Sequence, residues 1–369
     1  MEISENLFQL GHQITIIAPG YAKYTYKTKI NIVYVPILKF RFVRSLLYEI
    51  LCPIYMLIFF FFRKPDIVYW RQSYLTIFPV FISRLFQIKV VTEINGVTAE
   101  EVESEPLSSI RKKIILLIEK ANYAASNHLI CVSPRIKERL IEIYKLSGNK
   151  FTVILNGVNC LRLPVINKSK AKRTIGISPN LKIVGFVGHF FPWDGLEILI
   201  EAAAEVVNKM KDIRFLLVGQ GKWGNHLKRL VKNKNLEKFF IFTGRVPWDK
   251  LFLYLNSFDI ATAPYSKQIH KKSGSSLKIL EYFACNKPVV ASATESIPEI
   301  LDIKKKRLGL TVEPENSKDL AKAILFLLND RNLRKISGSG GRVYVEKERS
   351  WRIVAYKTSK KLKDVLMTS

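Results

Sequence analysis

The chain has 369 residues, of which 48% are hydrophobic, and this excludes a collagen-like or broadly disordered protein and favours two folded domains. Its formal net charge of +28 predicts an acidic partner, either nucleic acid, anionic lipid or a phosphorylated substrate. Zinc-finger spacing and base-stacking aromatic motifs are absent from the sequence, which argues against nucleic acid. The lysines are spread along the chain, as expected for a protein that works on an anionic membrane face and equally for a lysine-rich solvated surface. The four cysteines are far apart and predict buried reduced thiols and no metal site.

Six short apolar runs in the N-terminal half predict β-strands. They are rich in β-branched residues and nearly continuous in apolar character, as expected for parallel strands covered on both faces. Helical patterns lie between them at about 41–63, 74–86, 107–124 and 134–145. The half is therefore predicted to form a doubly wound sheet with right-handed crossovers. The predicted strands are 13–18, 30–35, 66–70, 89–93, 128–132 and 151–155.

The chain opens with a helical pattern at 3–10, followed by Gly11 and a strand. A doubly wound domain normally opens with a strand and a glycine-rich loop. We therefore expect that the first strand of this domain is missing from the sequence. Residues 1–10 are polar and do not predict a signal peptide.

An apolar stretch at 46–62 reads LLYEILCPIYMLIFFFF. Its uninterrupted apolar part, Ile50–Phe62, has 13 residues, whereas a membrane span needs roughly 20. Arg63 and Lys64 follow it directly. Two interpretations stay open: a buried helix of the domain, or a helix that dips into the membrane interface.

The second half begins after a break in the pattern. Strand 151–155 ends in an Asn-Gly turn signal, and residues 160–180 lose apolar periodicity, which predicts a linker. The alternation then restarts and predicts a second doubly wound domain. The predicted domains are 1–160 and 171–350, with a final helix at 351–369. The predicted strands of this half are 182–187, 214–218, 239–243, 259–263, 287–291 and 308–312.

Glycines follow three of these strands, in GFVGHF, FLLVGQG and FTGRV. Ligands of open α/β sheets bind at the carboxyl edge, where glycines let backbone N–H groups approach a phosphate. A tight strand-to-helix turn explains the first of these glycine segments equally well. Arg245 adds a cation that suits phosphate or carboxylate, although an exposed arginine of no function also fits.

The segment SGSSLKILEYFAC, from Ser273 to Cys285, is the most informative. Small polar residues precede an apolar-periodic helix, so their N–H groups and hydroxyls form an anion site at its N-terminus. Glu281 lies about a turn and a half further on. A carboxylate there can accept hydrogen bonds from vicinal hydroxyls, such as those of a ribose, and the plain alternative is a capping serine with an exposed glutamate.

With these segments the chain resembles the retaining glycosyltransferases of family 4, often called group 1. The resemblance covers nearly the whole chain and implies the GT-B fold, an α/β architecture with two Rossmann-like domains facing across a cleft. It assigns 1–160 to the acceptor side, 171–350 to the nucleotide sugar and 351–369 to a helix that returns to the first domain. The matching pieces are LGHQITIIAP, RKPDIVYWR, VVTEINGV, LICVSPRIKERL, VILNGVN, VGHFFPWDGLEILIEA, FLLVGQGKWGNHL, FTGRVPWDKLFLYLNSFDIATAPY and SGSSLKILEYFACNKPVVAS.

The resemblance also implies residue roles in the donor site. Glu281 matches the second glutamate of the Glu-x7-Glu motif, which binds the nucleotide ribose, and Ser273 stands where the first glutamate contacts the donor sugar. His189 and Asp194 align with the cations that hold the diphosphate, and Asp194 reverses the charge. Another cation is then needed to neutralise the leaving diphosphate, and the candidates are Lys222, Lys271, Lys272 and Lys278.

The remaining matches complete the candidate site. Gly274 to Leu277 match the segment at the diphosphate and sugar, and Arg245 with Val246 match the strand end near the base. Asn95 falls near the N-domain histidine of the family, and Glu93, two residues earlier, shares its face of the strand. The candidate catalytic residues are Glu93, Asn95 and His189. The candidate donor-binding residues are Gly188, Asp194, Gly219, Lys222, Arg245, Val246, Ser273, Gly274, Ser275, Ser276, Leu277, Lys278 and Glu281.

The function that the resemblance implies is transfer of a sugar from a UDP-, GDP- or ADP-sugar to a glycan or lipid-linked acceptor, with retention of configuration. Cell-surface polysaccharide or glycolipid assembly is the expected setting. We expect no bound cofactor, no metal and no nucleic acid, and a cytoplasmic protein peripheral to the inner face of the cytoplasmic membrane. The alternatives are a non-catalytic sugar-nucleotide-binding scaffold of the same fold, a GT-B-like epimerase and, with least support, a basic nucleic-acid binder.

Overall fold

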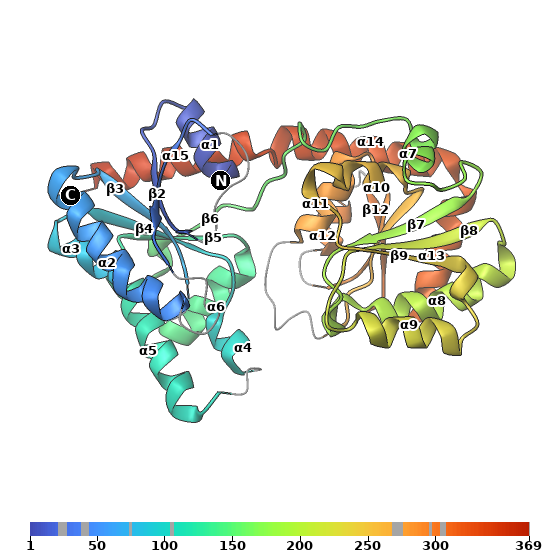
Figure 1. The fold of residues 1–369 in the computed structure, drawn as a ribbon, viewed down its shortest axis with the longest axis horizontal. Helices are drawn as coiled ribbons and strands as arrows, with labels where there is room; N and C mark the ends of the chain where they lie inside the picture. The colour runs from blue at the N-terminus through green and yellow to red at the C-terminus, as the bar shows by residue number, and fades with distance from the viewer. Residues whose placement is uncertain are drawn as a thin grey trace. The chain divides into compact units, whose positions relative to one another are not determined.

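The computed structural model describes residues 1–20, 28–37, 44–73, 76–103, 107–267, 276–294, 297–302 and 308–368. The chain divides into two compact units (Figure 1). Unit 1 holds Met1–Asn156 together with Trp351–Ser369, and unit 2 holds Gly157–Lys271 together with Ser276–Ser350. Unit 1 is therefore built from both ends of the sequence.

Unit 1 alternates strands and helices. Its described elements are α1 (Glu2–Gln9), β1 (Thr15–Pro19), β2 (Asn31–Val35), α2 (Arg44–Phe62), β3 (Ile67–Arg71), α3 (Phe78–Leu85), β4 (Lys89–Ile94), α4 (Thr98–Glu103), α5 (Ser109–Ala125), β5 (His128–Cys131), α6 (Pro134–Tyr144), β6 (Phe151–Val153) and α15 (Trp351–Met367). The parallel strands β3, β4, β5 and β6 lie side by side in sequence order, and β1 pairs in parallel with β2.

All six predicted strands of this half are present, but they divide between two sheets where the pattern predicted one. Helix α2 explains how the pair β1–β2 is held. Val35 of β2 is fully buried in a cluster with Cys52, Met56 and Phe60 of α2, and this cluster also includes Ile82 of α3. Apolar packing through α2 therefore fastens the strand pair to the rest of the unit.

Helix α15 belongs to the core of unit 1. It shares one buried apolar cluster with the four-stranded sheet. It also accepts a hydrogen bond from Lys89, whose Nζ donates to the carbonyl oxygen of Val365 at 3.0 Å. His12, just after α1, lies 2.6 Å through Nε2 from the Ser359 hydroxyl of α15. The cluster consists of Val91, Ile130, Ile154, Val354, Leu362 and Val365.

Unit 2 has one six-stranded parallel sheet. Its described elements are α7 (Lys168–Thr174), β7 (Lys182–Val187), α8 (Leu196–Lys209), β8 (Ile213–Val218), α9 (Gly224–Asn233), β9 (Phe240–Gly244), α10 (Leu251–Ser257), β10 (Ile260–Ala263), α11 (Leu277–Ala284), β11 (Val289–Ser292), α12 (Ile297–Asp302), β12 (Gly309–Val312), α13 (Ser317–Asn329) and α14 (Arg331–Glu348). The strand order is β12-β11-β10-β7-β8-β9. This is the doubly wound order, and its topological switch point lies between β7 and β10.

Helices cover both faces of this sheet (Figure 1). One core cluster takes its helical residues from α8, α9 and α13, and the other takes them from α10, α11, α12 and α14. The strands are buried between the two layers, which explains why their sequences read as continuous apolar runs. The carboxyl edge of the sheet is left for the loops that carry the candidate site.

The predicted linker at 160–180 is more ordered than its composition indicated. It contains α7, and Lys172 of α7 is buried, with Nζ 2.7 Å from Oδ2 of Asp259. Lys168, one turn earlier, pairs with the other carboxylate oxygen of Asp259. Lysines normally indicate an exposed face, so the pattern does not predict that these two hold a helix against the domain.

Helix α2 is apolar on both of its faces. Met56 and Phe60 point into the core, whereas Phe61 and Phe62 are 77% and 78% exposed. The helix is thus neither wholly buried nor amphipathic in the ordinary sense. None of the helices in the described part of the chain combines the length and apolar composition of a membrane span.

Candidate active site

The carboxyl edge of the unit 2 sheet is built around two glycines. Gly188 follows β7 and donates its backbone N–H to the carbonyl of Val218 at 3.0 Å, and Gly219 follows β8 and donates to the carbonyl of Gly244 at 3.0 Å. Gly219 has φ +133°, and a Cβ at this position would lie 1.9 Å from the carbonyl oxygen of Gly188. Only glycine fits there, so the two chain segments pack backbone to backbone beside the switch point.

Helix α11 is fixed across that switch point by a tyrosine that the sequence analysis did not single out. The Tyr282 hydroxyl accepts from the backbone N–H of Val187 at 2.9 Å and donates to the carbonyl of Thr262 at 3.1 Å. Val187 ends β7 and Thr262 lies in β10, the two strands that flank the switch point. The helix that carries Lys278 and Glu281 is therefore anchored to both.

Asp194 and Lys278 form a buried ion pair. Nζ of Lys278 lies 2.5 Å from Oδ1 of Asp194, and their side chains are 15% and 7% exposed. Nζ also lies 4.3 Å from the ring centroid of Phe186 and 4.8 Å from that of Tyr265. Burial alone would lower the pKa of Lys278, but Tyr265 and Asp194 together raise it above its ordinary value.

This pair changes how the reversed charge at Asp194 is interpreted. Lys278 was among the cations predicted from the sequence to neutralise a diphosphate. In the structure the positive charge of Lys278 is matched by Asp194, so the two together are neutral. Lys278 still lies next to Gly188, because a Cβ on that glycine would be 3.1 Å from Nζ.

Glu281 projects from α11, and burial raises the pKa of its carboxyl group from 4.5 to about 7, although Lys278 partly offsets this. Ser276 precedes the helix, and its hydroxyl lies 2.7 Å from the Tyr265 hydroxyl and does not cap the helix. Leu277, the first helical residue, is exposed. Ser273, Gly274 and Ser275 lie outside the described residues, as do Lys271 and Lys272.

The other predicted donor residues lie in the loops at the same edge of the sheet. His189 is exposed after β7, and its ring stacks on Phe191 with centroids 5.7 Å apart. Lys222 is exposed after β8, and Arg245 is exposed after β9. Val246 instead packs against the core cluster beneath. Three cationic or titratable side chains thus follow the ends of three neighbouring strands.

Unit 1 brings the other two predicted catalytic residues together at the end of β4. The amide of Asn95 donates to Oε1 of Glu93 at 2.7 Å. Two residues of β3 join them: the Tyr69 hydroxyl donates to Oε2 of Glu93 at 2.5 Å, and Nε of Arg71 lies 3.7 Å from Oε1. Burial and the neighbouring Glu93 carboxylate raise the pKa of Tyr69 well above its ordinary value.

Tyr69 and Arg71 were not predicted as site residues, although the sequence pattern contains a signal for them. Tyr69 and Arg71 are two residues apart in a strand and so share a face. The register pairs Arg71 with Glu93, which places both side chains beside the carboxylate. Within the residues that the structure describes, no three His, Cys, Asp or Glu side chains gather as metal ligands would.

Two family models match the chain. Residues 1–162 match the Glycosyltransferase Family 4 model, and residues 181–330 match the model of Glycosyl transferases group 1. An uncharacterized glycosyltransferase of Methanocaldococcus jannaschii is 31% identical over 62% of this chain and 58% of its own length. A GDP-mannose-dependent monoacylated α-(1-6)-phosphatidylinositol monomannoside mannosyltransferase of Corynebacterium glutamicum is 27% identical over 51% of this chain and 49% of its own.

Solved structures share the fold. Sucrose-phosphate synthase from Thermosynechococcus elongatus aligns with a TM-score of 0.79 at 18% identity, over 100% of this chain and 92% of its own. The Anabaena protein HepE, solved with UDP and glucose, aligns with a TM-score of 0.71 at 17% identity, over 90% of this chain and 86% of its own. Both comparisons extend over both units.

The match to the first curated relatives covers between 58% and 65% of their own lengths. The two family models match separate halves of the chain and together leave only the segment between them and the C-terminal residues unmatched. The fold that the resemblance implied is confirmed by the solved structures. The chain therefore consists of a Glycosyltransferase Family 4 domain at residues 1–162 and a group 1 glycosyl transferase domain at residues 181–330, and it has the GT-B fold.

Proposed function

We propose that this protein transfers a glycosyl group from a nucleotide sugar to a hydroxyl of a glycan or lipid-linked acceptor, with retention of anomeric configuration. The observation that carries the proposal is the built edge of the unit 2 sheet. Gly188 and Gly219 pack backbone to backbone there, and Tyr282 anchors α11, with the half-buried Glu281, across the switch point. Nucleotides bind doubly wound sheets at this position.

The donor is assigned to residues of unit 2. The Glu281 carboxylate accepts hydrogen bonds from the ribose hydroxyls, and the N-terminus of α11, which begins at Leu277, faces the diphosphate. Ser273, Gly274, Ser275 and Ser276 keep the diphosphate and sugar contacts that the resemblance implies for them. Because Asp194 neutralises Lys278, the exposed Lys222 and Arg245 supply the cationic groups for the phosphates and base, and the exposed His189 ring adds a hydrogen-bond donor. The donor is a UDP-, GDP- or ADP-sugar, in keeping with the UDP bound by HepE and the GDP-mannose named for the Corynebacterium relative.

Catalytic roles are assigned to Glu93 and Asn95 in unit 1 and, separately, to His189 in unit 2. Glu93 is held by donors on three sides, from Tyr69, Asn95 and Arg71, so its orientation is fixed before substrate arrives. A fixed carboxylate stabilises the positive charge that develops on the sugar ring as the bond to the diphosphate breaks. The acceptor hydroxyl then attacks the anomeric carbon on the face from which the diphosphate leaves, which retains the configuration, and the hydroxyl proton passes to the departing diphosphate oxygen.

The acceptor side is proposed to work at an anionic membrane surface, on the cytoplasmic face. Helices α2 and α3 each expose apolar side chains, and Arg63 and Lys64 follow α2 and are exposed. Apolar side chains flanked by basic ones suit the interface of an anionic bilayer. The exposed apolar residues are Ile50, Ile54, Leu57, Ile58, Phe61, Phe62, Phe78, Phe81 and Leu85.

The test begins with the donor. Thermal shift and isothermal titration with UDP, GDP, ADP and their sugars should identify one nucleotide that binds. Glu281→Ala should weaken that binding by roughly 10- to 100-fold, because a carboxylate that accepts two hydroxyl hydrogen bonds is lost. Glu201→Ala, on the exposed face of α8, is the matched control and should leave binding unchanged.

Turnover decides between an enzyme and a non-catalytic scaffold of the same fold. Transfer of labelled sugar to lipid acceptors in anionic vesicles, with the product configuration read by NMR, is the expected result. Tight nucleotide binding without transfer or donor hydrolysis would favour the scaffold, for which the neutralised Lys278 is the supporting observation. Wild-type transfer by Glu281→Ala would overturn the donor site.

A further inference from the structure

The end of strand β3 carries two of the groups that hold the Glu93 carboxylate. The Tyr69 hydroxyl and Nε of Arg71 both approach that carboxylate from β3. Strand β3 ends at Arg71, and the ends of elements open locally at little cost in free energy. The orientation of Glu93 therefore depends on what keeps the end of β3 beside β4.

Gln72, the residue that follows β3, supplies this connection. Its backbone N–H donates to the carbonyl of Glu93 at 3.0 Å, which continues the pairing of the two strands one residue beyond Arg71. Side chains alternate between the faces of a sheet, so the Gln72 side chain lies on the face that α5 covers, opposite to Arg71 and Glu93. Groups on that face can hold Gln72 without contacting a substrate at Glu93.

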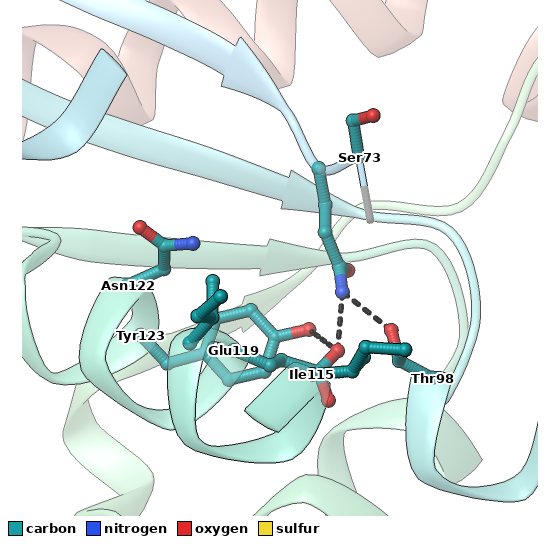
Figure 2. Close-up of a pocket in the computed structure, with 8 residues that line it drawn as sticks. Ser73, Thr98, Ile115, Glu119, Asn122 and Tyr123 are labelled. Carbon is teal, nitrogen blue, oxygen red and sulfur yellow. Dashed lines mark hydrogen bonds between the residues drawn. The ribbon is translucent and has the colours of Figure 1, made fainter. Parts of the chain in front are cut away.

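A buried carboxylate on α5 holds the Gln72 side chain. Glu119 is 5% exposed and accepts from the Gln72 amide, which also donates to the Thr98 hydroxyl at 2.8 Å. Glu119 is itself fixed, because it accepts from the Tyr123 hydroxyl at 2.6 Å and from the Tyr144 hydroxyl. Figure 2 shows Thr98 and Glu119 joined through the amide group. Gln72 is thus tied to α4 and α5 as well as to β4.

The cavity beside this network is too small to take a substrate group. Its space for the centre of a water-sized group is about 10 Å³, enough for about one water molecule. Gln72, Thr98 and Glu119 line it and bond to one another. These hydrogen bonds therefore fix the position of Gln72 and do not form a binding site.

We propose that Gln72 is a positioning residue for glycosyl transfer: held by the buried network on one face of the sheet, it fixes the Glu93 carboxylate on the other. The inference rests on the proposed function, in which Glu93 stabilises the charge that develops on the sugar ring. Gln72 acts through the backbone of β3 and β4 and contacts neither donor nor acceptor. Without its amide anchors the end of β3 is released together with Arg71, and Glu93 is no longer held in one orientation.

The test measures turnover of labelled UDP-glucose, UDP-N-acetylglucosamine, GDP-mannose and ADP-glucose, both as hydrolysis and as transfer to octyl glucoside. Gln72→Met keeps the length of the side chain but removes both donated hydrogen bonds. With the donor that the wild type uses, its kcat should fall at least about fivefold. The donor KM should stay within about twofold, because the donor is assigned to unit 2.

A double variant shows whether Gln72 acts through Glu93. Glu93→Gln alone should lower kcat by roughly 100-fold. Adding Gln72→Met to it should lower kcat by less than about twofold more, because the carboxylate that Gln72 positions is already gone. A further loss as large as that of Gln72→Met alone would show that Gln72 does not act through Glu93.

Thr92→Val is the matched control for a purely structural effect. Thr92 lies in β4 next to Glu93, is fully buried, and its hydroxyl lies 2.7 Å from that of Ser126. Loss of this hydrogen bond should lower the Tm by about 2–4 °C, as Gln72→Met should, but should leave kcat unchanged. If Gln72→Met does not fold, Thr98→Val, which is isosteric, removes one of the two amide anchors and should lower kcat by about two- to threefold.

The outcomes separate this inference from the function on which it rests. Wild-type kcat in folded Gln72→Met, or an equal loss in Thr92→Val, would overturn the positioning role even if Glu93→Gln is slow. Wild-type kcat in Glu93→Gln, or no turnover of any of these donors by the wild type, would instead overturn the proposed function and this inference with it.

Discussion

The buried pair of Asp194 and Lys278 gives a prediction about stability that can be worked from the structure. Their charged atoms are 2.5 Å apart and both side chains are largely removed from water. Removing one partner leaves the other charge buried and unpaired, which costs about 3–5 kcal/mol of unfolding free energy. We therefore expect Asp194→Asn and Lys278→Met each to lower the stability of unit 2 by this amount.

The double variant isolates the interaction between the two charges. Asp194→Asn combined with Lys278→Met removes both charges, so the double variant should lose much less unfolding free energy than the two single variants together. The coupling energy should be about 2 kcal/mol or more. Urea unfolding followed by tryptophan fluorescence measures all three. Lys322→Met is the control, because the 3.9 Å pair of Lys322 with Asp319 is exposed and should be worth no more than about 0.5 kcal/mol.

The pH dependence adds a second check. In Asp194→Asn the burial of Lys278 acts without its counter-charge, so its folded pKa should fall below the value of about 10.4 in the unfolded chain. Between the folded and unfolded pKa values of Lys278 the unfolded state then binds more protons. The unfolding free energy of the variant should therefore rise with pH across this range and recover part of what the substitution removed. Single losses below about 1 kcal/mol, or strictly additive losses, would refute the paired-charge reasoning.

Three further predictions concern the two units separately. The folded pKa of Glu281 is raised to about 7, so the folded state holds more protons between pH 4.5 and 7 and its stability should fall across that window by at most about 3 kcal/mol. Glu281→Gln should abolish this fall in urea titrations at pH 5 and pH 8, and an equal fall in the variant would assign it to other groups. Gly219→Ala places a Cβ 1.9 Å from a carbonyl oxygen and should cost more than about 2 kcal/mol, whereas Gly176→Ala, which meets open space, should cost about 1 kcal/mol. Replacing both Phe61 and Phe62 by serine should weaken cosedimentation with anionic vesicles by at least about tenfold. The reason is that burial of each phenylalanine ring in the bilayer interface contributes about 2 kcal/mol to binding. Unchanged cosedimentation would exclude α2 as the membrane contact.

The sequence predicted the strands well because burial on both faces leaves a plain signal. The run Lys182–Val187 was predicted with its observed bounds, and the other strands of unit 2 were found within about two residues. Helix α7 was missed because its packing depends on Lys168 and Lys172, which composition alone places in solvent. Local pattern thus predicts elements whose burial is apolar and misses those held by buried charge.

The site was predicted less completely, for a physical reason. Glu281 was proposed as a site residue from its place after a helix start, which is local information. The pairing of Asp194 with Lys278 joins residues 84 positions apart, and Tyr69 meets Glu93 only because of the register of β3 and β4. No single-sequence pattern encodes such distances, so the charge reversal at Asp194 could be noticed in the sequence but not resolved there.

The membership of α15 in unit 1 has a consequence for biosynthesis. Residues 157–350 separate α15 from the sheet that it covers, and at 5–20 residues per second a ribosome needs about 10–40 s to make them. Throughout that interval Val91, Ile130 and Ile154 lack the apolar partners that Val354, Leu362 and Val365 provide. Unit 2 can be complete while the nascent unit 1 still exposes an apolar sheet face. Chaperones that bind during synthesis should therefore bind the N-terminal half of the chain, which is made first.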